Sequence, residues 1–112
     1  MASTFKTSRE VIVRTQDWVA ATRFYESVLG LPVTLRTDNL MGFESGAFCL
    51  YVEKGHVHAP VFEFLVPDFE AAKRRLLDAG CVIQEENPDL PRCYIRDPYG
   101  LVFNLAQSPQ HR

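Results

Sequence analysis

Two stretches decide the fold of this chain: Glu10-Val-Ile-Val-Arg-Thr-Gln-Asp17 and Val61-Phe-Glu-Phe-Leu-Val-Pro-Asp68. Each is a short apolar run that ends at an aspartate. In both cases a helical stretch follows, and a glycine closes it at Gly30 and at Gly80. The spacing from aspartate to glycine agrees between the two copies to within one residue. Agreement this close favours an internal duplication, so we predict two copies of one module.

Each copy predicts a strand, a helix and three further strands. Asp17 and Asp68 stand where a carboxylate caps the first turn of a helix, and Gly30 and Gly80 suit the left-handed position that ends one. Apolar residues at helical spacing then predict helices over residues 18–29 and 69–79. Besides the two opening runs, the expected strands are residues 33–36, 40–43, 47–52, 81–85, 92–96 and 101–106. A tight turn is expected at Asp97-Pro98-Tyr99-Gly100.

Composition limits the class of protein. A length of 112 residues suits one domain, and 46% hydrophobic with 23% charged residues is typical of a globular chain. Twelve basic against fourteen acidic residues argue against a dedicated nucleic-acid partner. No apolar run reaches the ~20 residues that a membrane helix needs, and the N-terminus has no apolar signal core. We therefore expect a cytoplasmic protein with no membrane partner, whose cysteines (Cys49, Cys81 and Cys93) are reduced.

The duplication predicts a single domain over residues 8–107, made of two βαβββ modules at about 8–54 and 60–107. His56–Pro60 is the expected connection, and residues 1–7 and 108–112 are expected to be flexible ends. The fold class is α+β, with the helices packed on one face of a curved mixed sheet. Normal strand twist would make the other face a concave cup.

Three features together resemble the vicinal oxygen chelate superfamily: the repeated βαβββ order, the run Val28-Leu29-Gly30-Leu31 after Phe24-Tyr25, and the turn at Asp97-Pro98-Tyr99-Gly100. This superfamily includes glyoxalase I, bleomycin-resistance proteins, fosfomycin-resistance proteins and extradiol dioxygenases. The resemblance covers about Glu10 to Gln107. It implies a cup that holds a small molecule, and a homodimer.

The resemblance also implies four cup-facing metal ligands, whose positions fall here on Glu10, Cys49, Val61 and Asn104. Valine has no donor atom, and asparagine offers only a neutral amide. The thiol of Cys49 is soft, whereas the hard ions of oxygen-rich sites prefer carboxylates. We therefore expect no metal ion and no other cofactor, and metal-free proteins of the bleomycin-resistance type are the closer comparison.

Strand alternation assigns side chains to the two faces of the sheet. The residues expected to line the cup are Glu10, Ile12, Arg14, Cys49, Tyr51, Val61, Glu63, Leu65, Val102 and Asn104. The residues expected in the core are Val11, Val13, Phe48, Leu50, Val52, Phe62, Phe64 and Val66. The faces of Phe43 and Tyr94 stay undecided, and pairing of Arg14 with Glu63 across the opening strands is an alternative to ligand binding.

Three functions remain open. The first is a metal-free protein that sequesters or carries a small, partly aromatic ligand, as an antibiotic-resistance protein does. The second is a metal-dependent lyase, transferase or dioxygenase of the glyoxalase type. The third is a metal-free enzyme in which Glu63 or Glu10 is the general base, since a carboxylate in an apolar cup can have a raised pKa. Whether the chain is an enzyme is not decided by its sequence.

Overall fold

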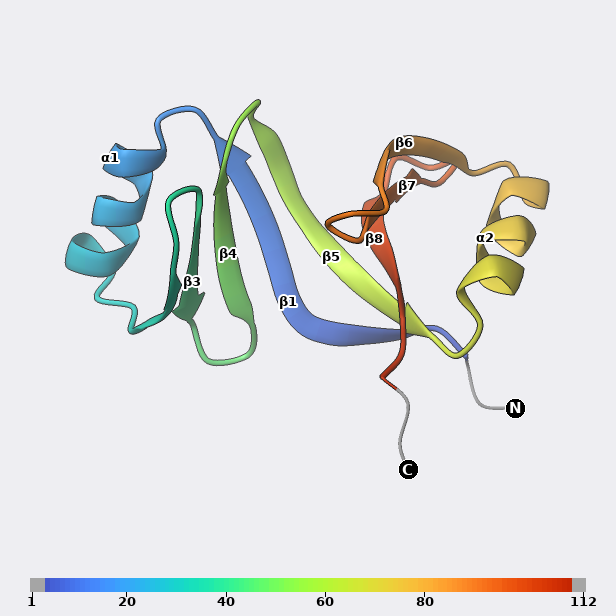
Figure 1. Ribbon diagram of the computed structural model, residues 1–112, viewed down its shortest axis with the longest axis horizontal. Helices are drawn as coiled ribbons and strands as arrows, with labels where there is room; N and C mark the ends of the chain where they lie inside the picture. Colours follow the sequence, from blue (N-terminus) through green and yellow to red (C-terminus); the bar gives the residue numbers. More distant parts are fainter. Residues whose placement is uncertain (1–3, 110–112) are drawn as a thin grey trace. The chain divides into compact units, whose positions relative to one another are not determined.

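The computed structural model describes residues 4–109, which divide into two compact units. The N-terminal unit is Arg9–Val61, and the C-terminal unit comprises residues 4–8 and 62–109. The elements, in chain order (Figure 1), are β1 (Lys6–Thr15), α1 (Trp18–Arg23), the π-helical turn η1 (Phe24–Val28), β2 (Val33–Arg36), β3 (Leu40–Glu44), β4 (Cys49–Lys54), β5 (His58–Val66), α2 (Phe69–Asp78), β6 (Val82–Asn87), β7 (Arg92–Arg96) and β8 (Val102–Gln107). This order confirms the predicted α+β class and the two βαβββ modules.

The N-terminal unit is a four-stranded mixed sheet in the order β2-β3-β4-β1, with α1 packed against β4. β1 pairs with β4 in parallel, and the other pairs are antiparallel. Its core is Met41, Phe43 and Val52, against which residues such as Val13 and Trp18 pack. The Trp18 Nε1–H donates to the Val52 carbonyl at 2.8 Å, which fixes the start of α1 over the sheet.

The C-terminal unit repeats this arrangement in the order β5-β8-β7-β6, with β5 and β8 parallel and α2 against β8 and β6. Phe64 meets Phe103 edge-on, with ring centroids 5.0 Å apart. The buried core residues are Val66, Ala72, Cys81, Cys93, Ile95, Phe103 and Leu105. Each unit therefore buries one face of its sheet under its own helix (Figure 1).

The predicted cap at Asp68 is confirmed, and the one at Asp17 is wrong. Asp68 has an extended backbone, and its Oδ1 accepts the Ala71 N–H at 3.1 Å. Asp17 precedes α1 but has φ −82° and ψ 49°, and its side chain makes no cap hydrogen bond. The extended backbone is what lets a capping carboxylate reach back to the first turn, and Asp17 does not adopt it.

The glycine stops and the late turn are confirmed. Gly30 and Gly80 have φ values of 69° and 100°, the left-handed region that favours glycine. After α2 the N–H of Cys81 donates to the Leu76 carbonyl at 3.0 Å, which satisfies the helix end. In the turn, Asp97 Oδ1 accepts two backbone N–H groups at 2.9 Å each. No helix within residues 4–109 has both the length and the apolar character needed to cross a membrane.

Element boundaries differ from the prediction in three places. The first helix ends in a π turn, where the Leu29 N–H donates to the Phe24 carbonyl five residues back. β5 already begins at His58, inside the expected connection. β1 begins at Lys6, inside the expected flexible end, next to Phe5, which packs against Phe64. The prediction of flexible ends also covers residues 1–3 and 110–112, which lie outside the described residues.

Two residues expected in the core are exposed. Phe62 is 47% exposed, because the cluster under α2 takes Phe64 and Val66 from the same face of β5 and does not extend to Phe62. Phe48 is 38% exposed, because it lies in the turn before β4 rather than in the strand. Phe43, whose face was undecided, is fully buried under α1.

Candidate functional site

Three polar side chains lie side by side on the sheet of the C-terminal unit. Glu63 on β5 is paired in register with Asn104 on β8, and Asn104 is paired with Tyr94 on β7. Their strand neighbours Phe103 and Ile95 belong to the core under α2. Because side chains alternate along a strand, these three residues share the face that points away from α2.

Asn104 is held in one orientation by two partners. It is 5% exposed, and its Oδ1 accepts the backbone N–H of Cys93 at 2.9 Å. Its Nδ2 donates to Glu63 Oε2 at 3.0 Å. Asn104 therefore positions the Glu63 carboxylate, while its own amide oxygen is used by the backbone of the neighbouring strand.

Arg92 and Glu85 extend this polar face, and sequence reasoning missed both. Arg92 Nη1 donates to Glu85 Oε2 at 3.3 Å, and its guanidinium carbon lies 5.0 Å from the Tyr94 ring centroid. A register shift between Ile83 and Glu85 sets Glu85 opposite Tyr94. Regular alternation would put the preceding residue there, so the sequence held no signal for Glu85. Arg92 could have been found, since it stands two residues before Tyr94 on the same strand.

The N-terminal unit carries the other predicted residues. Glu10, Ile12 and Arg14 on β1 pair in register with Cys49, Tyr51 and Glu53 on β4, so these six share the face away from α1, as alternation predicted for all but Glu53. Arg14 Nε donates to Glu53 Oε1 at 2.9 Å, with the two side chains 13% and 17% exposed. Glu53 was missed. An ion pair this sheltered fixes the position of the Arg14 guanidinium.

Tyr51 lies where the neighbouring strand has no side chain. Gly42 on β3 is paired with Tyr51, and a Cβ added at Gly42 would be 2.9 Å from Tyr51 Cε1. It would also be 2.9 Å from Thr34 Oγ1. The absence of a side chain at Gly42 is therefore what lets the Tyr51 ring lie across β3.

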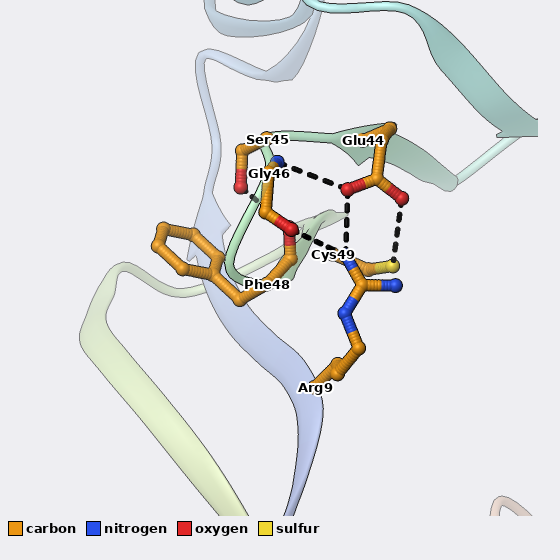
Figure 2. Close-up of polar contacts among 6 residues, drawn as sticks. All are labelled: Arg9, Glu44, Ser45, Gly46, Phe48 and Cys49. Carbon is orange, nitrogen blue, oxygen red and sulfur yellow. Dashed lines mark hydrogen bonds and ion pairs between the residues drawn. The ribbon is translucent and has the colours of Figure 1, made fainter.

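Cys49 belongs to a polar cluster at the turn between β3 and β4 (Figure 2). Its Sγ donates to Glu44 Oε1 at 3.7 Å, and Glu44 Oε2 accepts from Arg9 at 2.6 Å and from the Gly46 N–H at 2.9 Å. The hydrogen bond from Arg9 holds the pKa of Glu44 below its ordinary value, and the same bond raises the pKa of Arg9. The thiol thus faces a carboxylate that stays ionised.

The four positions that the resemblance assigns to a metal do not fit one. Val61 is 3% exposed and has no donor atom, and the Asn104 amide is engaged by the Cys93 N–H and Glu63. Glu10 and Cys49 alone make too small a donor set for a firm site. Within residues 4–109 no group of three or more histidine, cysteine, aspartate or glutamate side chains is arranged to hold an ion.

Residues 10–106 match the family described as the Glyoxalase-like domain. The chain belongs to this family. The resemblance derived from the sequence is thereby confirmed. A comparison of this glyoxalase-like domain with curated proteins found no match.

Solved structures agree with the fold of the glyoxalase-like domain. A glyoxalase/bleomycin resistance protein/dioxygenase superfamily member from Vibrio splendidus 12B01 is 17% identical, with 94% of this chain and 100% of that chain covered and a TM-score of 0.67. The hypothetical protein BH1468 from Bacillus halodurans C-125 is 9% identical, with 98% and 99% covered and a TM-score of 0.70. Homoprotocatechuate 2,3-dioxygenase from Brevibacterium fuscum is 20% identical, with 99% and 39% covered and a TM-score of 0.69. This chain thus spans well under half of the dioxygenase, and identities this low show the fold alone.

Proposed function

We propose that this glyoxalase-like domain binds a small organic molecule without a metal ion, and that the polar face around Glu63 and Asn104 takes part in the binding. The single observation that carries the proposal is the fixed amide of Asn104, which is bonded to the Cys93 N–H and to Glu63. An asparagine side chain binds a metal ion through its amide oxygen. Here the amide oxygen of Asn104 accepts the Cys93 N–H, and the amide nitrogen donates to the Glu63 carboxylate.

The face has the mixed character of small-molecule pockets, which are mostly apolar with a few fixed polar groups. Leu65 and Ala106 lie two register pairs beyond Glu63 and Asn104, on the same face, and supply apolar surface. The Tyr94 ring, with the Arg92 guanidinium beside it, is 2% exposed and supports this face. This combination favours a ligand with a planar apolar part and a hydrogen-bond donor for Glu63. The N-terminal unit carries its own predicted ligand-binding residues, among them Arg14 and Tyr51, on the face away from α1.

A thermal-shift screen of the metal-stripped chain against small aromatic compounds and antibiotics tests this function. A ligand that binds only the folded chain raises the unfolding midpoint in a concentration-dependent way. We expect Glu63→Gln and Tyr94→Phe to reduce the shift, and Arg74→Ala, on the exposed face of α2, to leave it unchanged. Shifts that appear only after a divalent ion is added would contradict the proposal.

A second candidate is a metal-free enzyme with Glu63 as general base. The observation in its favour is that Asn104 holds the carboxylate at 3.0 Å on a face with apolar neighbours. A general base within reach of the substrate contributes about 10²–10⁴-fold to the rate. With a substrate identified by the screen, Glu63→Gln must lower turnover by a factor of this order, and unchanged turnover removes the candidate. Glu10 is exposed, which makes it the weaker base candidate.

The assembly and location belong to the proposal as well. We expect a homodimer in the cytoplasm, with a small molecule as the partner and neither nucleic acid nor membrane involved. Light scattering at micromolar concentration measures the mass directly. A monomer mass across the accessible concentration range contradicts the dimer and leaves ligand binding to be judged by the screen.

A further inference from the structure

A pocket of about 440 Å³ lies beside the start of α2 in the C-terminal unit. Its volume falls in the range of sites that hold small molecules. The apolar part of its lining comes from Phe69, Pro88, Pro91, Cys93, Leu105 and Ala106. Phe69, Cys93 and Leu105 also belong to the core under α2, so the pocket opens beside that core, and neither Glu63 nor Asn104 lines it.

Hydrogen bonds hold the walls of this pocket. Gln107 Oε1 accepts the Phe69 N–H at 2.9 Å, and Gln107 Nε2 donates to the Val66 carbonyl at 3.2 Å and to that of Pro67. These bonds tie the end of β8 to the start of α2. In a preorganised site, little conformational entropy is lost when a ligand binds.

Another part of the wall is the short turn between β6 and β7, which supplies Pro88 and Pro91. The Asp89 N–H donates to Asn87 Oδ1 at 3.0 Å, and the Leu90 N–H donates to the Asn87 carbonyl at 3.2 Å. Pro88 lies inside this turn and Pro91 directly follows it, and their rings fix the backbone φ. Hydrogen bonds and proline rings of the protein itself therefore constrain both parts of the wall.

The floor of the pocket is uncharged. Leu105 is 1% exposed and Cys93 is 2% exposed. Burial, followed by the neighbouring charge of Glu86, raises the pKa of the Cys93 thiol to about 11. The thiol is therefore protonated at neutral pH, so the deep part of the pocket suits an apolar group.

The rim carries three charged side chains, and two of them form ion pairs. Glu86 accepts from Lys73 at 2.6 Å, and Arg92 donates to Glu85 at 3.3 Å. The third, Glu70, is an exposed carboxylate in the first turn of α2. With the partners Lys73 and Glu85 counted, these groups carry one net negative charge, which favours a cation over an anion.

We propose that this pocket is a second ligand site, which binds a small hydrophobic amine with its apolar body against Phe69 and Leu105 and its ammonium group at Glu70. The size of the pocket, its uncharged floor and the charges of its rim together define this ligand class. The site shares Arg92 and Ala106 with the face of the proposed function, but neither Glu63 nor Asn104 lines it.

Titration of the isotope-labelled full chain with three matched compounds, followed by amide NMR, tests the proposal. The probes are phenethylamine, phenethyl alcohol and phenylacetate, which share a ring and differ in charge. We expect phenethylamine to bind with a Kd of millimolar order and phenylacetate about tenfold more weakly. The shifted amides should lie in residues 69–70, 86–93 and 105–107. Shifts centred on Glu63 and its neighbours on β5, or no saturable shift below about 10 mM amine, would overturn the proposal.

Two variants with the same charge change separate Glu70 from the general charge of the chain. Glu70→Gln should weaken phenethylamine binding about threefold to fivefold and leave phenethyl alcohol unchanged, as expected for one exposed charge pair. Asp78→Asn removes one charge at the far end of α2 and should change neither. Equal loss in both variants, or no loss in Glu70→Gln, would contradict an ammonium group at Glu70.

Discussion

The two units place different chemistry on the same register positions. Ile12 stands five residues before Asp17, as Glu63 stands five before Asp68. In the N-terminal unit Ile12 is paired with Tyr51, whereas in the C-terminal unit Glu63 is paired with Asn104.

Two register pairs further along the strands, on the same face, the contrast reverses. The N-terminal unit has the ion pair Arg14–Glu53, and the C-terminal unit has the apolar pair Leu65–Ala106. A polar and an apolar pair have therefore exchanged places between two copies of one backbone. The duplication preserved the sheet and not the chemistry of its face, so each copy needs its own functional interpretation.

The aromatic residues show a related exchange. In the N-terminal unit Tyr51 on β4 lies opposite Gly42 on β3. In the C-terminal unit the tyrosine is on the other strand of the corresponding pair, because Tyr94 on β7 lies opposite Asn104 on β8. A ring is kept in both copies, and the residue across from it is small or polar.

The largest expected effects test whether the two cores are equivalent. Phe43 and Ile95 are fully buried and hold corresponding places, paired with Val33 and Ile83 just before a register shift in each unit. We expect Phe43→Ala to lower the free energy of unfolding by about 3–5 kcal/mol, and Ile95→Ala by about 2–5 kcal/mol. Urea denaturation measures both. A loss below about 1 kcal/mol in one unit alone would break the equivalence.

Asn104→Ala tests the contrast on the polar face. The change leaves the buried N–H of Cys93 without its acceptor and Glu63 without its amide donor, so we expect a loss of about 2 kcal/mol in the free energy of unfolding. Glu63→Gln keeps an acceptor for Asn104 and is the matched control, with a much smaller expected loss. If both variants were equally stable, Asn104 would not be the residue that organises this face.

The thiols give a third comparison, between Cys93 under α2 and Cys49 at the turn of the other unit. Because burial raises the pKa of Cys93 to about 11, the unfolded chain releases this proton at lower pH than the folded chain does. The free energy of unfolding should then fall between pH 9 and pH 11, by about 1 kcal/mol at pH 10. Urea melts at several pH values, compared with those of Cys93→Ala, isolate this contribution. A fall of the same size in the variant would contradict the assignment to Cys93.

The smallest effects come from the two helix starts. Asp68 caps α2 through the Ala71 N–H, so Asp68→Ala should cost about 1 kcal/mol. Asp17 makes no such bond, so Asp17→Ala should cost only a few tenths of a kcal/mol. Thermal unfolding of the two variants measures the difference. Equal losses would show that Asp17 caps α1 in solution.

Local signals carried most of what could be predicted. The cap at Asp68, the stop at Gly80 and the turn that begins at Asp97 depend on residues within four positions along the chain, and their hydrogen bonds confirm them. Alternation likewise assigned Glu63 and Asn104 to one face, because their strands are regular at those positions.

The missed residues depend on pairing between distant segments. Glu85 joins the polar face through a register shift that no spacing reveals, and Gly42 acquires its role only beside Tyr51. Phe62 has the pattern of a core residue, but its exposure depends on where the cluster under α2 ends. Sequence period gives the face of a strand and does not say how far the covering helix reaches.

Calorimetric titration of the metal-stripped chain with Mn²⁺ and with Ni²⁺ tests the central claim most directly. The donor set at Glu10, Cys49, Val61 and Asn104 predicts no stoichiometric binding of either ion at micromolar concentration. Binding of one ion per chain that is lost in Glu10→Ala would contradict the claim and favour a metal-dependent function.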